Sequence, residues 1–598
     1  MNFFNLNYSL VFDPLSLFFV FVILLISIPS AVYSVGYLKH EFSHKKIVSA
    51  WILLFLFVLS MLLVVTVSNA LLFLICWEVM SLVSFFLVVF DTEDKKSIKA
   101  GIIYIVMTHI GTAFITASLL VMFQYAHSFD FIAMKQACLA MPANTKNIVF
   151  LFLLIGFGTK AGIVPLHIWL PYAHPQAPSH ISSIMSGVMI KTAIYGIIRF
   201  VIFILGANTF WWGNLILIFA SISCLVGVMY ALMEHDIKKL LAYHSVENIG
   251  IILLGVGASI VFTSINLPVL AVLSLAAGLY HLVNHAIFKS LLFLGAGSIY
   301  KATGLRDIEK LGGLIKTMPY TAVSFLIGSM AISALPPLNG FVSEWLTLQV
   351  LFSGMINLTG ASKISMCIYA AALALTGGLA AACFVKAFGI SFLAMPRSDE
   401  AKNAKEVSAW MYIPMFFLSA LTLIFGIFAA QILKVLSKIA ESASGLSPAP
   451  VYKFNLSLPL TALALVLIAA AVYLSVRYIF GPRKVTIGKT WGCGYYNLDS
   501  RTEYSATAFS KPFRIAFSFF YRPSRKTEKI SDSFYHVKSF KHETSITPVF
   551  NKYIYDFILK NTLDTANYLS RFQSGSIHFY IAYIFIAIVF LIVFMGRF

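Results

Sequence analysis

The chain has 598 residues, of which 59% are hydrophobic and only 11% are charged, and its mean hydropathy is +0.87. A soluble domain holds about 25% charged residues, so this composition excludes a soluble globular protein and indicates a polytopic membrane protein. The net charge of +19 does not indicate nucleic-acid binding, because the Lys and Arg residues gather in loops that alternate along the chain, as the positive-inside rule predicts.

The sequence contains no motif for a redox or nucleotide site. Its six cysteines are scattered and form no CxxC pair, which excludes the usual iron–sulfur and zinc frameworks. No glycine-rich phosphate loop follows a predicted strand. We therefore expect no cofactor and no metal ion in this chain.

Fourteen hydrophobic segments are long enough to cross a bilayer as helices, and they predict an all-α polytopic membrane fold. In chain order they are 12–36, 49–67, 70–90, 99–123, 147–171, 182–204, 212–233, 238–260, 267–298, 319–353, 366–394, 411–432, 455–479 and 577–597. We divide the chain into a core at 1–400, further transmembrane helices at 401–480, a polar segment at 481–576 and a last helix at 577–598.

The loops after odd-numbered spans carry most of the Lys and Arg residues, whereas the loops after even-numbered spans carry few. Lys238, Lys301 and Arg306 are examples from the odd-numbered loops. By the positive-inside rule, the odd-numbered loops face the cytoplasm and both termini face the opposite side. The polar segment 481–576 is then cytoplasmic.

Residues 547–573 within this polar segment have the pattern of an amphipathic helix. Phe550, Ile554, Phe557 and Ile558 form an apolar stripe, and charged residues lie elsewhere on the helix surface. Such a helix lies along the membrane plane or along neighbouring spans. The alternative is a solvated cytoplasmic helix with one packed face.

Two of the predicted spans are interrupted by proline. The fifth reads GFGTKAGIVPLHIWLP, with Pro165 in its middle, and the tenth reads ALPPLNGFVSEW, with Pro336 and Pro337 followed by Gly340. Proline removes a backbone donor, and broken backbone at membrane depth persists only where protein or a watery cavity satisfies it. Two broken helices five spans apart indicate two five-helix repeats in inverted orientation, although proline kinks are common in membrane helices.

Ionisable residues recur inside the central spans, although each costs about 2.5–3.5 kcal/mol at mid-membrane on insertion scales. Desolvation favours the neutral form of a buried lysine, and a nearby carboxylate favours its charged form. Moving such a carboxylate would therefore load or unload a proton. One such residue is often only structural, but a set of this size indicates a proton path: Glu78, Lys160, Lys191, His244, Glu247, His281, His285, Lys289, Glu344 and Lys386.

The clearest part of this set is the segment HLVNHAIFKS at 281–290. His281, His285 and Lys289 recur at every fourth residue, which places them on one face of a helix. Histidines four residues apart can also bind a metal ion. The third member of this stripe is a lysine, a poor ligand when protonated, and no HExxH motif accompanies it, so we favour a proton relay.

These segments resemble the antiporter-like subunits of respiratory complex I and their relatives, the proton-conducting membrane transporter family. The resemblance covers most of residues 12–395 in the family's order. It is carried by FDPLSLFF (12–19), CWEVMSLVSFFLV (76–88), GTKAGIVPLHIWLPYAHPQAPSHISSIMSGVMIKTAIYG (158–196), DIKKLLAYHSVENIG (236–250), HLVNHAIFKSLLFLGAGSI (281–299) and LPPLNGFVSEW (335–345).

The resemblance implies roles for individual residues. Glu78 is similar to the family's gating glutamate, and Lys160 to its partner lysine at the first broken helix. Lys191 and the 281–289 stripe are similar to the connecting relay. Glu344 is similar to the outlet group, where relatives carry Lys or Glu.

Within the family, LAYHSVENIG (241–250), TWGCGYYNLDSRTEYSATAFSKP (490–512) and the C-terminal span resemble component B of hydrogenase-4 and its formate hydrogenlyase counterpart. This implies a subunit of a redox-driven proton pump in a bacterial or archaeal cytoplasmic membrane. Its partners would be other membrane subunits of a complex I-like assembly and a peripheral redox module that holds any NiFe and Fe–S centres. The alternatives are a cation/proton antiporter subunit and a membrane module that energises inorganic-carbon uptake.

Overall fold

The structure is a computed structural model that describes residues 10–39, 43–206, 209–446, 457–481, 486, 488, 491–495, 497–500, 502–531, 537–546, 548–570 and 575–595. The chain divides into two compact units, Met1–Pro512 and Phe513–Phe598. The first unit holds all ten candidate residues.

The first unit begins with the spans that contain the first break, and polar N-cap residues start several of them. Asp13, for example, accepts a hydrogen bond from the Ser16 amide at the start of the first helix. The elements are α1 (Pro14–Leu38), α2 (His44–Thr66), α3 (Ala70–Val88), α4 (Lys95–Ala126), α5 (Phe131–Ala140), α6 (Ala143–Ala161), α7 (Leu170–Gln176), α8 (Ser179–Ile184), the π-helix η1 (Met185–Met189), α9 (Ile190–Gly196) and the π-helix η2 (Ile197–Ile204).

The rest of the first unit repeats this arrangement of long helices around a second break. Its elements are α10 (Phe210–Met233), α11 (Ile237–Ser264), α12 (Pro268–Thr303), the 3-10 helices η3 (Ile308–Lys310) and η4 (Leu314–Lys316), α13 (Pro319–Ile332), α14 (Asn339–Asn357), α15 (Gly360–Phe392), α16 (Asp399–Lys402), α17 (Ala409–Ile427), α18 (Ala429–Ser444) and α19 (Ser457–Phe480). Helix α20 (Ala506–Ala516) crosses the boundary between the two units.

The second unit contains one antiparallel hairpin followed by helices. Strands β1 (Ser524–Ser531) and β2 (Val537–Ser545) pair with Ser524 opposite Ser545. The helices are α21 (Ser518–Tyr521), the π-helix η5 (Asn551–Tyr555), α22 (Asp556–Ser570) and α23 (Ile577–Met595). The helix predicted at 547–573 is thus present from 551 to 570, and its Phe557 and Ile558 side chains are exposed.

The predicted all-α polytopic fold is confirmed. In the part of the chain that the structure describes, eleven helices are long and apolar enough to cross a membrane. The other three predicted spans correspond to the interrupted pairs α6–α7 and α13–α14 and to α23. Three elements were not predicted from the sequence: the β1–β2 hairpin, the short helix α5 and the amphipathic helix α18.

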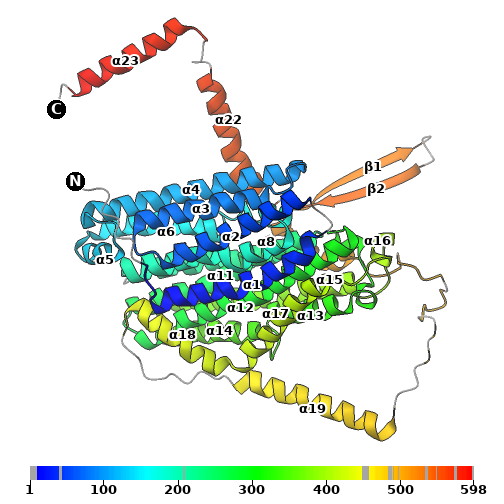
Figure 1. Ribbon diagram of the computed structural model, residues 1–598. Helices are drawn as coiled ribbons and strands as arrows, with labels where there is room; N and C mark the ends of the chain where they lie inside the picture. The colour runs from blue at the N-terminus through cyan, green and yellow to red at the C-terminus, as the bar shows by residue number, and fades with distance from the viewer. Residues whose placement is uncertain are drawn as a thin grey trace. The chain divides into compact units, whose positions relative to one another are not determined.

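The middle of the helix bundle is formed by the segment from α8 to η2 together with α11 and α12. In the most apolar stretch of Ser179–Ile204, 94% of the residues are buried inside the chain. The corresponding share is 94% for α11 and 100% for α12. By contrast, only 39% of the residues in the most apolar stretch of α4 are buried. Figure 1 shows α3, α4 and α6 side by side along one flank, and α4 packs against both α3 and α6.

Both predicted helix breaks are present, but neither begins at its proline. Helix α6 ends at Ala161 because Gly162 takes the left-handed conformation, and Pro165 lies in the following turn before α7. Pro336 and Pro337 lie in the turn between α13 and α14. Gly340 lies in the first turn of α14, not in the break; its missing side chain lets α14 approach the Ala331 carbonyl.

A partly buried ion pair that was not predicted from the sequence joins the start of α1 to η2. The Arg199 guanidinium donates to both carboxylate oxygens of Asp13 at 2.6 and 2.8 Å, and its side chain is 5% exposed. Asp13 lies just before the span. Burial raises the pKa of its carboxyl, but the hydrogen bonds and charge of Arg199 outweigh burial and leave this pKa below its usual value.

We predict that Asp13→Asn destabilises the first unit. Removing one partner leaves the buried guanidinium without its counter-charge, and a loss of about 2–3 kcal/mol is expected for a charged hydrogen-bonded pair of which one member is partly exposed. The measurement is the apparent melting temperature of the detergent-solubilised chain. Asp564→Asn, on exposed α22, is the matched control; an equal melting temperature for Asp13→Asn and this control would contradict the prediction.

Candidate functional site

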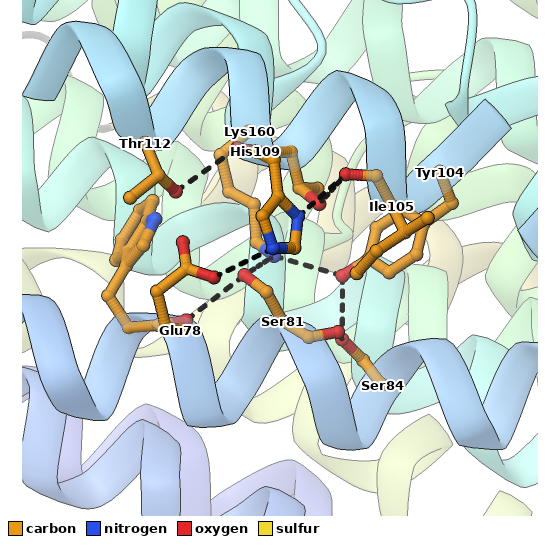
Figure 2. A network of polar contacts seen from close by, with 10 residues as sticks. Glu78, Ser81, Ser84, Tyr104, Ile105, His109, Thr112 and Lys160 are labelled. Carbon is orange, nitrogen blue, oxygen red and sulfur yellow. Dashed lines mark hydrogen bonds and ion pairs between the residues drawn. The ribbon is translucent and has the colours of Figure 1, made fainter. Parts of the chain in front are cut away.

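Lys160 lies in the last turn of α6, directly before the first break, and its side chain points at α3 and α4. Its Nζ donates to Ser81 Oγ at 2.8 Å and to the Tyr104 hydroxyl at 2.9 Å. Figure 2 shows these contacts together with Ser84, whose Oγ lies 2.6 Å from the same hydroxyl. The amine is therefore fully buried but held by neutral oxygens, an arrangement that accommodates both its charged and its neutral form.

Glu78, near the middle of α3, lies on the outer side of this group. Its Oε2 is 3.4 Å from His109 Nε2 on α4, and Figure 2 shows the two side chains facing each other. Glu78 and Lys160 interact electrostatically, but no ion pair joins these two described residues. The predicted pair is therefore a cluster of five residues: Glu78, Ser81, Tyr104, His109 and Lys160, here named the Glu78 cluster.

Two methionine sulfur atoms lie between the Glu78 cluster and the middle of the bundle. The Tyr104 hydroxyl donates to Met189 Sδ at 3.5 Å, and Thr192 Oγ1 donates to Met80 Sδ at 3.7 Å. Thioether sulfur is a weak acceptor. This stretch between Lys160 and Lys191 therefore offers fewer strong hydrogen-bond partners than the clusters on either side of it.

Lys191 is fully buried between the two π-helical stretches of the sixth span. Its Nζ donates to the Ser186 carbonyl oxygen of η1 at 2.5 Å. Ser186 Oγ in turn lies 2.7 Å from Ser245 Oγ, which connects η1 to α11. Short π-helical stretches inside α-helices occur often at functional sites.

Side chains of α11, α12 and α14 meet in a second polar group. His244 Nδ1 contacts Glu247 Oε2 one turn away, and Asn248 Nδ2 donates to the His244 carbonyl at 2.8 Å. His281 Nε2 lies 3.1 Å from Asn248 Oδ1, and His281 Nδ1 lies 3.0 Å from Ser343 Oγ on α14. Hydrogen bonds therefore connect His244 and Glu247 of the eighth span and His281 of the ninth with the second broken helix.

The other two members of the stripe on α12 have no hydrogen-bond partner among the described residues. Lys289 Nζ and both ring nitrogens of His285 are fully buried. The His285 ring lies 6.5 Å from the His281 ring, and Lys289 Nζ lies 5.7 Å from the centre of the Phe293 ring. Lys289 also interacts electrostatically with Glu247. We refer to Lys191, His244, Glu247, His281, His285 and Lys289 as the central cluster.

The last two predicted residues occupy different surroundings. Glu344 is 8% exposed on α14, where Gly377 of α15 leaves room for its carboxylate, and it interacts electrostatically with Glu247. Lys386 Nζ instead donates to the carbonyls of Leu232 and Glu234 at 2.7 and 2.8 Å. Lys386 therefore caps the C-terminal end of α10 and makes no hydrogen bond to the other predicted residues.

Several residues that connect these groups were not predicted from the sequence, because they are uncharged or lie near helix ends. Asn284 Nδ2 donates to the Asn339 carbonyl at 2.8 Å and so anchors α12 to the first turn of α14. Lys238 Nζ donates to the Ala177 carbonyl at 2.5 Å, after the first break. His174 is fully buried and interacts electrostatically with Lys191, Lys238 and Lys289.

A cavity of about 360 Å³ opens beside Lys238. Its lining comes from residues after the first, third, fifth, seventh and ninth spans, on the side that the positive-inside rule assigns to the cytoplasm, and includes Asp91, Asp94, Lys301 and Arg306. Because the lining carries charged groups of both signs, the cavity suits water better than an apolar ligand. Across the described residues, no group of three or more His, Cys, Asp or Glu side chains could hold a metal ion.

Comparison with known proteins identifies the family. A model described as "NADH:quinone oxidoreductase/Mrp antiporter, TM" matches residues 67–368, and one described as "NADH-Ubiquinone oxidoreductase (complex I), chain 5 N-terminus" matches residues 1–46. Hydrogenase-4 component B of Escherichia coli is 38% identical over 97% of this chain and 88% of its own length. Formate hydrogenlyase subunit 3 of the same organism is 36% identical over 76% of this chain and 72% of its own length.

A solved structure has the same fold. A chain in the structure of the membrane-bound sulfane sulfur reductase, an archaeal respiratory membrane complex, superimposes with a TM-score of 0.78. The match covers 99% of this chain and 90% of that chain at 22% sequence identity. The chain therefore belongs to the NADH:quinone oxidoreductase/Mrp antiporter transmembrane family, as an antiporter-like subunit of the complex I type.

Proposed function

We propose that this chain carries protons across the membrane as one subunit of a redox-driven complex of the hydrogenase-4 or formate hydrogenlyase type. The observation that carries the proposal is the succession of ionisable side chains from partly buried Glu78 on α3, through fully buried residues of the middle spans, to buried Glu344 on α14. They lie in the Glu78 cluster, in the central cluster within the most buried helices, and at the second broken helix. Buried charges are costly in a membrane, and their usual role is in ion and proton paths.

The central cluster requires water to complete this path. A buried polar atom without a partner costs about 1–3 kcal/mol, and water is its commonest substitute partner. Three such atoms lie on a single face of α12: the two ring nitrogens of His285 and the Nζ atom of Lys289. Water molecules bridging them would join Lys191 to Glu247 and then to Glu344, so that protons move by exchange along the bridge.

The cavity beside Lys238 supports an inlet from the cytoplasmic side. It ends against the turn that follows the first break, where Lys238 contacts Ala177. His174 interacts electrostatically with both Lys238 and Lys289. A proton that enters through this cavity would therefore reach the central cluster through the Lys238–His174 side.

The driving reaction would occur outside this chain. We place the NiFe and Fe–S centres of such a complex in partner subunits of a peripheral redox module, and this chain beside other membrane subunits in a bacterial or archaeal cytoplasmic membrane. The relatives named as hydrogenase-4 component B and formate hydrogenlyase subunit 3 support this assignment.

Redox events would change the charge near Glu78, and the change would be passed to Lys160. Lys386, which caps α10, would act on the central cluster through its charge alone.

The second candidate is a subunit of a cation/proton antiporter, since the family description also names the Mrp antiporter. The residues of the proton path would be shared by both functions. Transport that continues when Na⁺ and K⁺ are replaced by a bulky organic cation favours the redox-driven pump, and transport that stops favours the antiporter.

We predict that Lys160→Ala and Glu78→Gln each lower proton translocation by about 100-fold or more, the range expected when a positioned proton-transfer group is lost. Both variants should still assemble, because Lys160 is held by neutral side chains only. The measurement is acidification of vesicles that contain the intact complex, driven by its own electron-transfer reaction. Lys363→Ala, at an exposed position, is the matched control. Wild-type acidification with Lys160→Ala would refute the proposed function.

We also predict that Lys289→Arg impairs translocation about as strongly as Lys289→Met. Arginine stays protonated and cannot pass a proton on, whereas a purely structural cation would be replaced better by Arg than by Met. The same vesicle measurement compares the two variants, with exposed Lys316→Arg as the control. If Lys289→Arg pumps at the wild-type rate, Lys289 is structural and the path avoids it.

A further inference from the structure

The side of the Glu78 cluster that faces away from Lys160 contains a residue to which the sequence analysis gave no role. His109 lies near the middle of α4, and its side chain is 56% exposed on the surface of the chain. The neighbouring side chains on α3 and α4 are apolar and exposed: Ile75, Val79, Leu82, Val106 and Ile110. A histidine at this depth, on an otherwise apolar flank, requires an explanation beyond solvation by bulk water.

The hydrogen bonds of His109 fix where its protons are. Nδ1 lies 2.9 Å from the Ile105 carbonyl oxygen, and because a carbonyl can only accept, Nδ1 carries a hydrogen. In the neutral ring, Nε2 is then an acceptor, yet it faces Glu78 Oε2 at 3.4 Å. Two acceptors repel each other, so this contact is favourable only when one proton is bound there, on His109 or on Glu78.

We propose that His109 is the outer proton-holding residue of the Glu78 cluster, and that the proton it shares with Glu78 is the one that passes to Lys160. The inference rests on the proposed function and adds a third residue to its first step. Its support is geometric: Glu78 lies between an exposed imidazole on one side and a fully buried amine on the other.

The transfer balances in two steps. The protonated imidazole gives its Nε2 proton to the Glu78 carboxylate, which leaves a neutral histidine and a neutral carboxylic acid. The acid then gives this proton to the neutral Lys160 amine, which leaves a carboxylate and an ammonium ion. The three groups have a net charge of zero before, between and after the two steps, so no step places an unbalanced charge in the apolar interior.

The other groups of the cluster fit this sequence. The titratable side chains that face one another are Glu78 on α3, Tyr104 and His109 on α4, and Lys160 on α6. Glu78 Oε1 is buried without a hydrogen-bond partner among the described residues, so the carboxyl has a free oxygen for a second partner. After the transfer, repulsion between neutral His109 and the carboxylate favours movement of Glu78 towards Lys160.

The test compares His109→Gln and His109→Lys in the intact complex. Glutamine keeps a hydrogen-bonding side chain but holds no extra proton, whereas lysine keeps a proton-holding group beside Glu78. We expect His109→Gln to lower vesicle acidification at least about tenfold and His109→Lys to retain more of it, following the loss of a positioned proton-transfer group. His44→Gln, at the exposed start of α2, is the matched control. Equal or greater pumping by His109→Gln than by His109→Lys would overturn the proposal.

A second readout does not depend on pumping. Infrared spectra of the complex in nanodiscs, recorded as the pH is varied, report the carboxyl band of Glu78, which is identified by its loss in Glu78→Gln. We expect this band to titrate together with histidine ring bands in the wild type and to shift its midpoint in His109→Gln. An unchanged midpoint in His109→Gln would overturn the proposal that His109 and Glu78 share a proton. This result would hold even if wild-type acidification by Lys160→Ala had already refuted the proposed function. Normal pumping by His109→Gln, with Lys160→Ala inactive, would overturn only the role of His109.

Discussion

An ionisable side chain in the middle of a membrane has no bulk water around it, and the cost of removing it from water constrains the rest of this structure. The chain meets that cost in different ways at different places. Arg199 is neutralised by Asp13 through two short hydrogen bonds. Lys160 and Lys191 are held by hydroxyl and carbonyl oxygens instead of carboxylates. The first arrangement fixes a charge permanently, whereas the second leaves the lysine able to exist with or without its proton.

Irregular backbone supplies polar atoms to some of the buried groups, whereas Lys160 is held by side chains of the regular helices α3 and α4. The first break ends α6 directly after Lys160, and the π-helix η1 presents the Ser186 carbonyl to Lys191. At the second break, Ser343 and the Asn339 carbonyl meet His281 and Asn284 from α12. Regular helices satisfy their own backbone and offer little to a neighbour. At Lys191 and Asn284, the irregular backbone and the buried polar side chains therefore occur together for one physical reason.

Ionisable residues recur five spans apart. Glu78 and Glu247 lie in the third and eighth spans, and Lys160 and Glu344 in the fifth and tenth, where the breaks occur. Five is odd, so successive units of five spans cross the membrane in opposite directions. This supports the inverted repeat that the two prolines predicted. His109 in the fourth span then corresponds in position to the stripe of α12 in the ninth.

Hydropathy was sufficient to predict the spans, and the cost of buried charge was sufficient to select ten candidate residues. Partners were harder to predict, because contacts between helices depend on packing that a single sequence does not encode locally. Glu78 was expected beside Lys160, yet its ion-pair partner is His109. Tyr104, Asn248 and Ser343 escaped notice because uncharged polar residues are common in membrane helices. Helix α18 is amphipathic and buries only one face by packing on α12, so its mixed composition resembled a loop.

In the proposed function, protons cross this chain through a hydrated path at Lys289 and His285. The most direct measurement is an electron cryo-microscopy map of the intact complex that resolves ordered water. We predict water density within hydrogen-bond distance of Lys289 Nζ and both His285 nitrogens, continuing past Glu247 to Glu344. Dry packing of apolar side chains around Lys289 and His285, with no water between them and Glu247, would contradict the account.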